Sequence, residues 1–272
     1  MLPRSMSYVD VHCHLIHPRF TGEEDAVAAR AHAAGLEFVI VNGLEPRSNR
    51  DVVALCRRHS YLLPAVGIYP VDACAAVIDR EAWQHPFEPP TVFDVDAEID
   101  WIDSVASEII AIGECGLDAH WVKDAAALAE QERVLRRLCA VAKRHDKPMI
   151  LHTRKAEART LALLLEEGVT RADFHCYGGK LKLAKRVAEA GFYLSIPPVV
   201  ERSEAFQRLA QELPLDRILT ETDSPYMGPD SGERNEPANV PRGVAAIAAA
   251  RGETPSFVAE QVRANFRALF RR

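Results

Sequence analysis

Strand-like and helix-like segments alternate along almost the whole of this chain of 272 residues. Eight short segments have the composition of strands, and a helix-like segment follows nearly all of them. The strand-like segments are residues 8–13, 38–41, 61–66, 109–112, 148–151, 172–175, 192–196 and 218–222. Because no low-complexity linker divides the chain, the alternation predicts an α/β protein with one (β/α)8 TIM barrel spanning residues 1–272.

A doubly wound parallel sheet is the alternative architecture for such an alternation. It is disfavoured because no glycine-rich phosphate-binding turn follows the first strand-like segment. Residues 72–91 are less regular and contain Pro86, Pro89 and Pro90, which predicts a long loop. In a barrel, the residues that follow the strands gather at one mouth, where barrel enzymes carry out their chemistry.

Composition and charge restrict the partners and the compartment. With 48% hydrophobic and 26% charged residues, the chain resembles ordinary soluble globular proteins. The formal net charge of −6 argues mildly against tight non-specific DNA binding, although a local basic or metal-charged cleft would be enough for an enzyme. Six scattered cysteines without a CxxC motif suit a reducing compartment, and no signal peptide or membrane span is apparent. We therefore expect a cytoplasmic monomer that does not bind membranes.

The first strand-like segment ends in His12-Cys13-His14. Side chains alternate along a strand, so His12 and His14 should face the same way and offer two imidazoles to a divalent metal. Alone, such a pair is a weak signal, because two neighbouring histidines often form only a polar loop entrance. The same alternation predicts that Cys13, and likewise Cys176 beside His175, are not ligands.

Four further strand-like segments end at or just before a residue that can bind metal: Glu114, His152, His175 and Asp223. Asp223 alone could simply open a turn, and His175 alone could be a hydrogen-bonded barrel histidine. Glycines on both sides of Glu114 would let the backbone turn sharply there and bring its carboxylate close to a ligand. Glu114 is harder to explain structurally because a buried carboxylate is costly unless it is paired. Together with His12 and His14, these residues predict a site for two divalent ions, either Mg, Mn or Zn.

These stretches resemble the TatD-type metal-dependent deoxyribonucleases of the amidohydrolase-like barrel superfamily, and the resemblance runs from about residue 8 to about residue 270. The matching stretches are Val11-His12-Cys13-His14, Gly113-Glu114-Cys115-Gly116-Leu117-Asp118, Leu151-His152-Thr153-Arg154, His175-Cys176-Tyr177-Gly178-Gly179, Glu221-Thr222-Asp223-Ser224-Pro225 and Arg234-Asn235-Glu236-Pro237-Ala238-Asn239-Val240. The chain departs from the family at Tyr69, where a histidine is usual, and at Tyr177, where a phenylalanine is usual. The segment 72–94 carries little of the family pattern.

The resemblance implies a role for each ligand-type residue. His12, His14 and Asp223 would hold one metal, His152 and His175 the other, and Glu114 would bridge the two. Because Asp223 would lie beside the metal with one oxygen free, we expect it to take a proton from the attacking water. Glu221 shares its strand face, and we expect it to support the ligands from one layer deeper. Superfamily relatives often bridge the metals with a carbamylated lysine on strand four. Because Glu114 stands in that place here, the sequence argues against a cyclic-amide hydrolase of that kind.

Four further residues are candidates for substrate binding. Arg154 could clamp a phosphate or form a structural salt bridge, and Tyr69 and Tyr177 could stack on a base or pack in the core. Asn235 lies in the family-like stretch after the last strand. The resulting prediction is a metal-dependent phosphodiesterase, a 3′–5′ exodeoxyribonuclease acting on single-stranded or frayed DNA ends. The alternatives are an ester or amide hydrolase, such as an aminoacyl-tRNA deacylase, and a nuclease component of a larger assembly.

Overall fold

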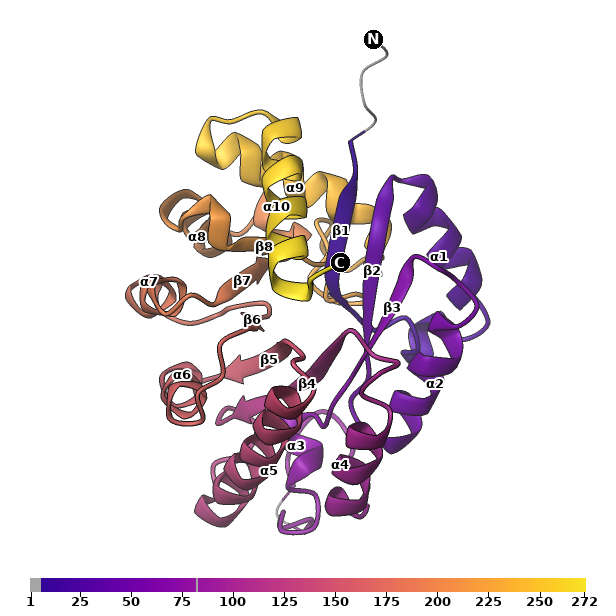
Figure 1. Ribbon diagram of the computed structural model, residues 1–272, viewed down its shortest axis with the longest axis vertical. Helices are drawn as coiled ribbons and strands as arrows, with labels where there is room; N and C mark the ends of the chain where they lie inside the picture. Colours follow the sequence, from indigo (N-terminus) through magenta and orange to yellow (C-terminus); the bar gives the residue numbers. More distant parts are fainter. Residues whose placement is uncertain (1–5, 82) are drawn as a thin grey trace.

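Eight parallel strands in chain order form the interior of the molecule (Figure 1). The computed structural model describes residues 6–81 and 83–272. The strands are β1 (Tyr8–Cys13), β2 (Leu36–Asn42), β3 (Leu62–Val66), β4 (Ala111–Asp118), β5 (Met149–Arg154), β6 (Ala172–Phe174), β7 (Tyr193–Ile196) and β8 (Ile218–Thr220). Each strand pairs in parallel with the next, so the predicted strand order is confirmed.

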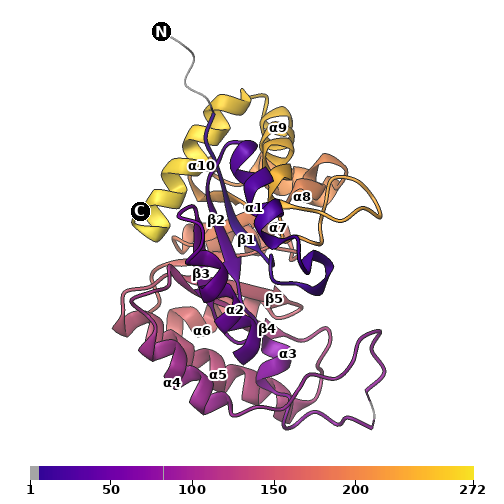
Figure 2. The ribbon, with the colours of Figure 1, turned by 90° about the vertical axis from the view of Figure 1, so that its right-hand side faces the viewer.

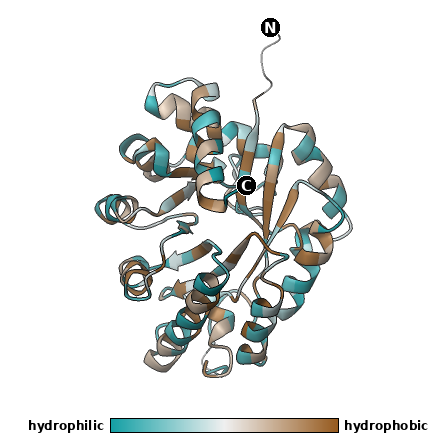
Figure 3. Cartoon of the chain, in the orientation of Figure 1, coloured by the Kyte–Doolittle hydropathy of each residue, from teal (hydrophilic) through white to brown (hydrophobic). Residues whose placement is uncertain are grey.

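Helices surround the ring of strands (Figures 1 and 2). They are α1 (Glu24–Ala33), α2 (Pro46–Cys56), α3 (Pro70–Ala73), α4 (Val95–Ser104), α5 (Ala125–Arg144), α6 (Glu157–Glu166), α7 (Leu181–Glu189), α8 (Glu204–Glu212), α9 (Val240–Arg251) and α10 (Pro255–Phe270). Over the residues that the structure describes, the connections also contain four short 3-10 helices: η1 (Pro18–Phe20), η2 (Pro198–Glu201), η3 (Leu215–Arg217) and η4 (Pro237–Asn239). Hydrophobic residues concentrate on the strands, as Figure 3 shows. No helix within residues 6–81 and 83–272 is long and apolar enough to cross a membrane.

The longest helix, α5, illustrates how the sequence sets these elements. Its first turn is capped by the Asp124 carboxylate, which accepts hydrogen bonds from the N–H groups of Ala126 at 2.9 Å and Ala127 at 3.0 Å. Basic residues in its last turn complement the helix dipole. One face is buried, and α5 contacts β4 and thereby supports the strand that carries Glu114.

Hydrogen bonds close the seam between the first and last strands. Thr220 Oγ1 donates to Val9 O at 2.7 Å, and Asp223 N donates to His12 O at 2.8 Å. Beneath them, the buried Asp10 carboxylate accepts hydrogen bonds from Thr222 N at 3.0 Å and Thr222 Oγ1 at 2.6 Å. The predicted (β/α)8 barrel is therefore confirmed.

Strand four differs from the prediction. The expected strand ended at Ile112, with Glu114 in a turn, whereas β4 continues through Glu114 to Asp118. The glycines permit close strand packing instead of a turn. A Cβ on Gly116, whose φ is +145°, would lie 2.0 Å from His152 O, and one on Gly113 would lie 2.7 Å from Ile150 O.

Two strands end earlier than predicted. β6 ends at Phe174, so His175 lies beyond its strand, and β8 ends at Thr220, so Asp223 lies three residues beyond its strand. Cys176 has a φ of +43°, and strand alternation therefore does not determine where its side chain points. For Cys13, which lies on β1, the alternation argument holds: its buried thiol donates to Ile40 O at 3.4 Å.

Candidate metal centre

Glu114 lies at the centre of four histidines. Its Oε1 is 3.0 Å from His152 Nδ1 and 3.1 Å from His175 Nε2. Its Oε2 is 3.3 Å from both His12 Nε2 and His14 Nε2. The two oxygens of one buried carboxylate therefore divide the histidines into two pairs.

Asp223 adds a second carboxylate on the side of His12 and His14. Its Oδ1 is 3.6 Å from His14 Nε2 and 3.8 Å from His12 Nε2. The residue has a φ of +50°, in the left-handed region that aspartate tolerates better than most residues. The bond from its N–H to His12 O, and one from His14 N–H to Ser224 O at 2.9 Å, fasten this loop to β1.

The spacing of the donor atoms fits a divalent ion. A tetrahedral ion with ligands about 2.1 Å away separates neighbouring ligand atoms by about 3.4 Å. The Nε2 atoms of His12 and His14 are 3.1 Å apart, and both sets His12–His14–Asp223 and His12–Glu114–His175 have their donor atoms within 4.8 Å of one another. His152 belongs to neither set, although it contacts Glu114.

The electrostatics of the cluster also favour a cation. Burial alone would raise the pKa of Glu114, but His175, His12, His14 and His152 hold that pKa well below its usual value. Burial would likewise lower the pKa of His14, but hydrogen bonds to Asp223 and Glu114 raise it to about 10. The buried carboxylates thus attract positive charge, which protons on the histidines or divalent ions can supply.

Asp118 positions His152, a contact that the sequence did not reveal. Asp118 Oδ2 is 2.9 Å from His152 Nε2, while its Oδ1 accepts the N–H groups of His120 and Trp121 at 2.8 Å each. When His152 Nε2–H donates to Asp118, Nδ1 keeps its lone pair toward Glu114, as a metal ligand requires. One feature of the sequence could have indicated this role: Asp118 lies four residues after Glu114, on the same face of one strand.

We expect Asp118→Asn to weaken binding of the ion beside His152 by about 10–100-fold. The amide has one acceptor oxygen where the carboxylate has two, so either His152 or the two backbone N–H groups lose their acceptor. Calorimetric metal titration would measure the change. Asp103→Asn is the matched control, because Asp103 pairs with His145 at 2.7 Å on the surface; equal affinities in the two variants would contradict the assignment.

Buried acids extend beneath the cluster. Glu221 Oε2 is 3.6 Å from His175 Nδ1, and Glu221 Oε1 accepts the N–H of Cys176 at 2.7 Å, in keeping with the expected deeper position of Glu221. Ser195 Oγ lies 2.8 Å from Glu221 Oε2 and 2.7 Å from Asp173 Oδ2. Asp10 Oδ1 accepts the N–H of His12 at 3.1 Å. Sequence reasoning assigned no role to Asp10 or Asp173.

Arg154 and Tyr69 lie beside the cluster. The Tyr69 ring meets His152 edge-on, with centroids 4.9 Å apart and planes at 70°. The exposed Arg154 guanidinium lies 4.9 Å from the centre of the Trp121 ring. It forms no ion pair with any residue that the structure describes, so the structural salt bridge considered for Arg154 is not observed.

Tyr177 and Asn235, two of the residues predicted to bind substrate, are buried. Only 1% of each is exposed. Tyr177 packs in the hydrophobic core, and its hydroxyl donates to Lys180 O at 3.3 Å, so no ring face is free for a base. The Asn235 amide donates to Thr222 O at 2.8 Å and Tyr226 O at 2.7 Å, so it holds the loop that carries Asp223.

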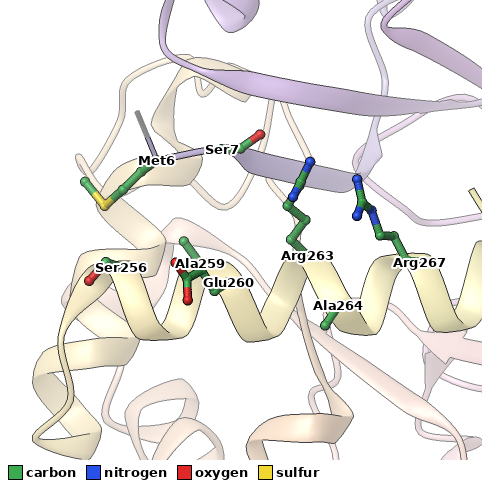
Figure 4. Close-up of a pocket in the computed structure, with 8 residues that line it drawn as sticks. All are labelled: Met6, Ser7, Ser256, Ala259, Glu260, Arg263, Ala264 and Arg267. Atoms are coloured by element: carbon green, nitrogen blue, oxygen red, sulfur yellow. The ribbon is translucent and has the colours of Figure 1, made fainter. Parts of the chain in front are cut away.

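A pocket elsewhere on the molecule is lined by no histidine that the structure describes. It lies between the start of β1 and α10, at the end of β1 opposite the histidines (Figure 4). Its two arginines, Arg263 and Arg267, are already paired with Glu37. We assign this pocket no function.

Comparison with known proteins supports the same conclusion as the geometry. The model of the TatD related DNase family matches residues 9–271. The chain is 32% identical to the human deoxyribonuclease TATDN3 over 273 residues, which cover 99% of this chain and 97% of that protein. It is 30% identical to a Salmonella typhimurium protein named 3′-5′ ssDNA/RNA exonuclease TatD over 274 residues, which cover 96% of this chain and 98% of that one.

A solved structure shows the same architecture. The crystal structure of YJJV, a TatD homologue from Escherichia coli k12, superposes with a TM-score of 0.82 at 26% sequence identity. The match covers 97% of this chain and 98% of that one. The protein is therefore a hydrolase of the TatD-related DNase family.

Proposed function

We propose that this protein is a 3′–5′ exodeoxyribonuclease that removes nucleotides from single-stranded or frayed DNA ends with two divalent ions, Mg, Mn or Zn. The observation that carries the proposal is the division of the two Glu114 oxygens between two pairs of histidines. We assign His12, His14 and Asp223 to one ion and His152 and His175 to the other. Bound there, the ions would acidify a water molecule and neutralise charge on the scissile phosphate.

Asp223 is suited to accept the proton of the attacking water. Its side chain is 16% exposed, whereas that of Glu114 is 4% exposed, so water reaches Asp223 more easily. Burial would raise the pKa of Asp223, but hydrogen bonding to His14 and the nearby His175 and His12 lower it. The carboxylate is therefore ionised near neutral pH and able to act as a base.

Arg154 is suited to hold a phosphate of the substrate. It lies two residues beyond His152 on β5, is exposed, and has no carboxylate partner among the described residues. A guanidinium can pair with two phosphate oxygens at once. Tyr69 replaces the histidine usual in the family, and its ring against His152 can contact the terminal nucleotide.

A terminal phosphodiester reaches a site at a barrel mouth more easily than one within a stiff duplex. We therefore expect preference for single strands, mononucleotide products and a shallow salt dependence of binding, because each phosphate contact contributes only about −0.7 to the logarithmic slope. The name of the Salmonella typhimurium relative supports this direction. The test is a time course with each metal on end-labelled linear and closed-circular single strands, over a salt series.

Rapid cutting of the closed circle would make the protein an endonuclease. Failure to cleave any DNA or RNA with any metal would favour the alternative of ester or amide hydrolysis, with an aminoacyl ester as the substrate to try next. Activity that appears only with added cell extract would favour a component of a larger assembly. We also propose a cytoplasmic monomer; its six free cysteines are compatible with a reducing compartment.

A further inference from the structure

Three aromatic rings lie side by side, and one of them, Trp121, lies beside Arg154. The Trp121 ring meets Phe87 at a centroid distance of 5.0 Å and His85 at 5.2 Å, both nearly at right angles. Phe87 and His85 come from the loop between α3 and α4, which projects from the body of the molecule in Figure 2. Phe87 is 41% exposed, so part of its ring faces solvent.

The inner side of this group is anchored. Trp121 and Trp83 pack against a small core cluster that includes Val71 and Val122, and Trp83 Nε1 donates to Phe87 O at 2.7 Å. Packing explains the buried faces of the two tryptophans. It does not explain why Phe87 remains exposed at the outer edge.

Asp118 links the backbone at Trp121 to the metal centre. Its carboxylate contacts His152 at 2.9 Å and accepts the backbone N–H of Trp121 at 2.8 Å. Asp118 and Arg154 are paired residues on the neighbouring strands β4 and β5, and the Arg154 guanidinium lies over the Trp121 ring. The rings therefore form a path that leads outward from His152.

Arg154 lies over the Trp121 ring, and two lysines are close to Trp121 and Arg154 in sequence. Lys123 follows Trp121 by two residues, and Lys155 follows Arg154 directly. The structure, over its described residues, gives none of these three cations an ion-pair partner, although arginines on the helices, such as Arg133 and Arg242, pair with acids. In a chain with a net charge of −6, such a local group of free cations favours a polyanion.

We propose that this aromatic strip, formed by His85, Phe87 and Trp121 and flanked by Lys123, Arg154 and Lys155, binds the single-stranded DNA that extends from the scissile nucleotide. Unpaired bases stack on the exposed Phe87 ring and on the half-buried His85 and Trp121 rings, and the cations contact backbone phosphates, as in other proteins that bind single strands without sequence preference. The inference rests on the proposed exonuclease function and adds the position of the strand outside the metal centre.

The test compares long and short substrates. For wild type, Phe87→Ala and the double variant Lys123→Ala/Lys155→Ala, kcat and KM are measured on a ten-nucleotide oligothymidylate and on a thymidine dinucleotide. We expect the ratio of kcat/KM between long and short substrate to fall about tenfold in Phe87→Ala, through KM. The double variant should also reduce the salt slope by about 0.7 for each lost phosphate contact.

Matched controls are available away from the strip. Phe257 on α10 is 48% exposed, and Arg186 is exposed in the last turn of α7, so Phe257→Ala and Arg186→Ala should leave the ratio unchanged. If wild type cleaves DNA but the ratio and the salt slope are unchanged in both strip variants, the strip is not a binding surface, and the exonuclease proposal stands. If wild type neither binds nor cleaves single strands, both proposals fail.

Discussion

Glu114→Gln should lower turnover by about 10³-fold or more while the barrel remains folded. One carboxylate faces four histidines through two oxygens, and an amide can offer only one acceptor and carries no charge. Loss of a single preorganised electrostatic group at a reacting centre typically costs about 10²–10³ in rate, and here two ion sites lose the same charge. The measurements are kcat on a single-stranded oligonucleotide and metal content by elemental analysis.

The control for Glu114→Gln is Glu37→Gln. Glu37 lies on β2 and pairs with Arg263 and Arg267, away from the histidines. This variant should keep wild-type turnover, and circular dichroism should show the same fold for both. Full activity of Glu114→Gln with full metal content would rule out a carboxylate shared between two ions.

Removing His12 and removing His152 should each cost one ion, but not the same ion. His12 faces Glu114 Oε2 and Asp223, whereas His152 faces Glu114 Oε1. Metal content should therefore fall from about two ions per chain toward one in both His12→Ala and His152→Ala, because each site loses a ligand that the other site does not use. Elemental analysis after dialysis gives the stoichiometry.

Double variants show which site each histidine serves. His12→Ala combined with His152→Ala should lose both ions, whereas His12→Ala combined with His14→Ala should lose little more than either single variant. His32→Ala is the control, since His32 lies on α1 and stacks on Tyr61. A single variant that still binds two ions would show that its histidine is not a ligand.

The position of the cluster was predictable from sequence because parallel strands in a barrel all end at one mouth. That rule brought His12, His152 and Asp223 together without any knowledge of side-chain contacts. The ends of the strands were less predictable than the position of the cluster. Glycines beside Glu114 suggest a turn in the sequence alone, and only the neighbouring strand reveals that they permit close packing.

The supporting residues could not be predicted because their partners are remote in the chain. Asp10 bonds to Thr222, which is 212 residues away, and a single acid within an apolar strand does not indicate what it contacts. Burial is equally hidden: Tyr177 and Tyr69 are both tyrosines near a strand end, yet the first packs in the core and the second meets His152. Burial depends on the whole fold, which local sequence does not specify.

The seam between β1 and β8 has a consequence for the timing of activity during synthesis. His12 and His14 leave the ribosome about 200 residues before Asp223 and the loop after β8 that fastens them. Contacts of such long sequence separation form late in folding. A growing chain therefore cannot complete the proposed metal site until the loop that carries Asp223 has been made and has reached β1.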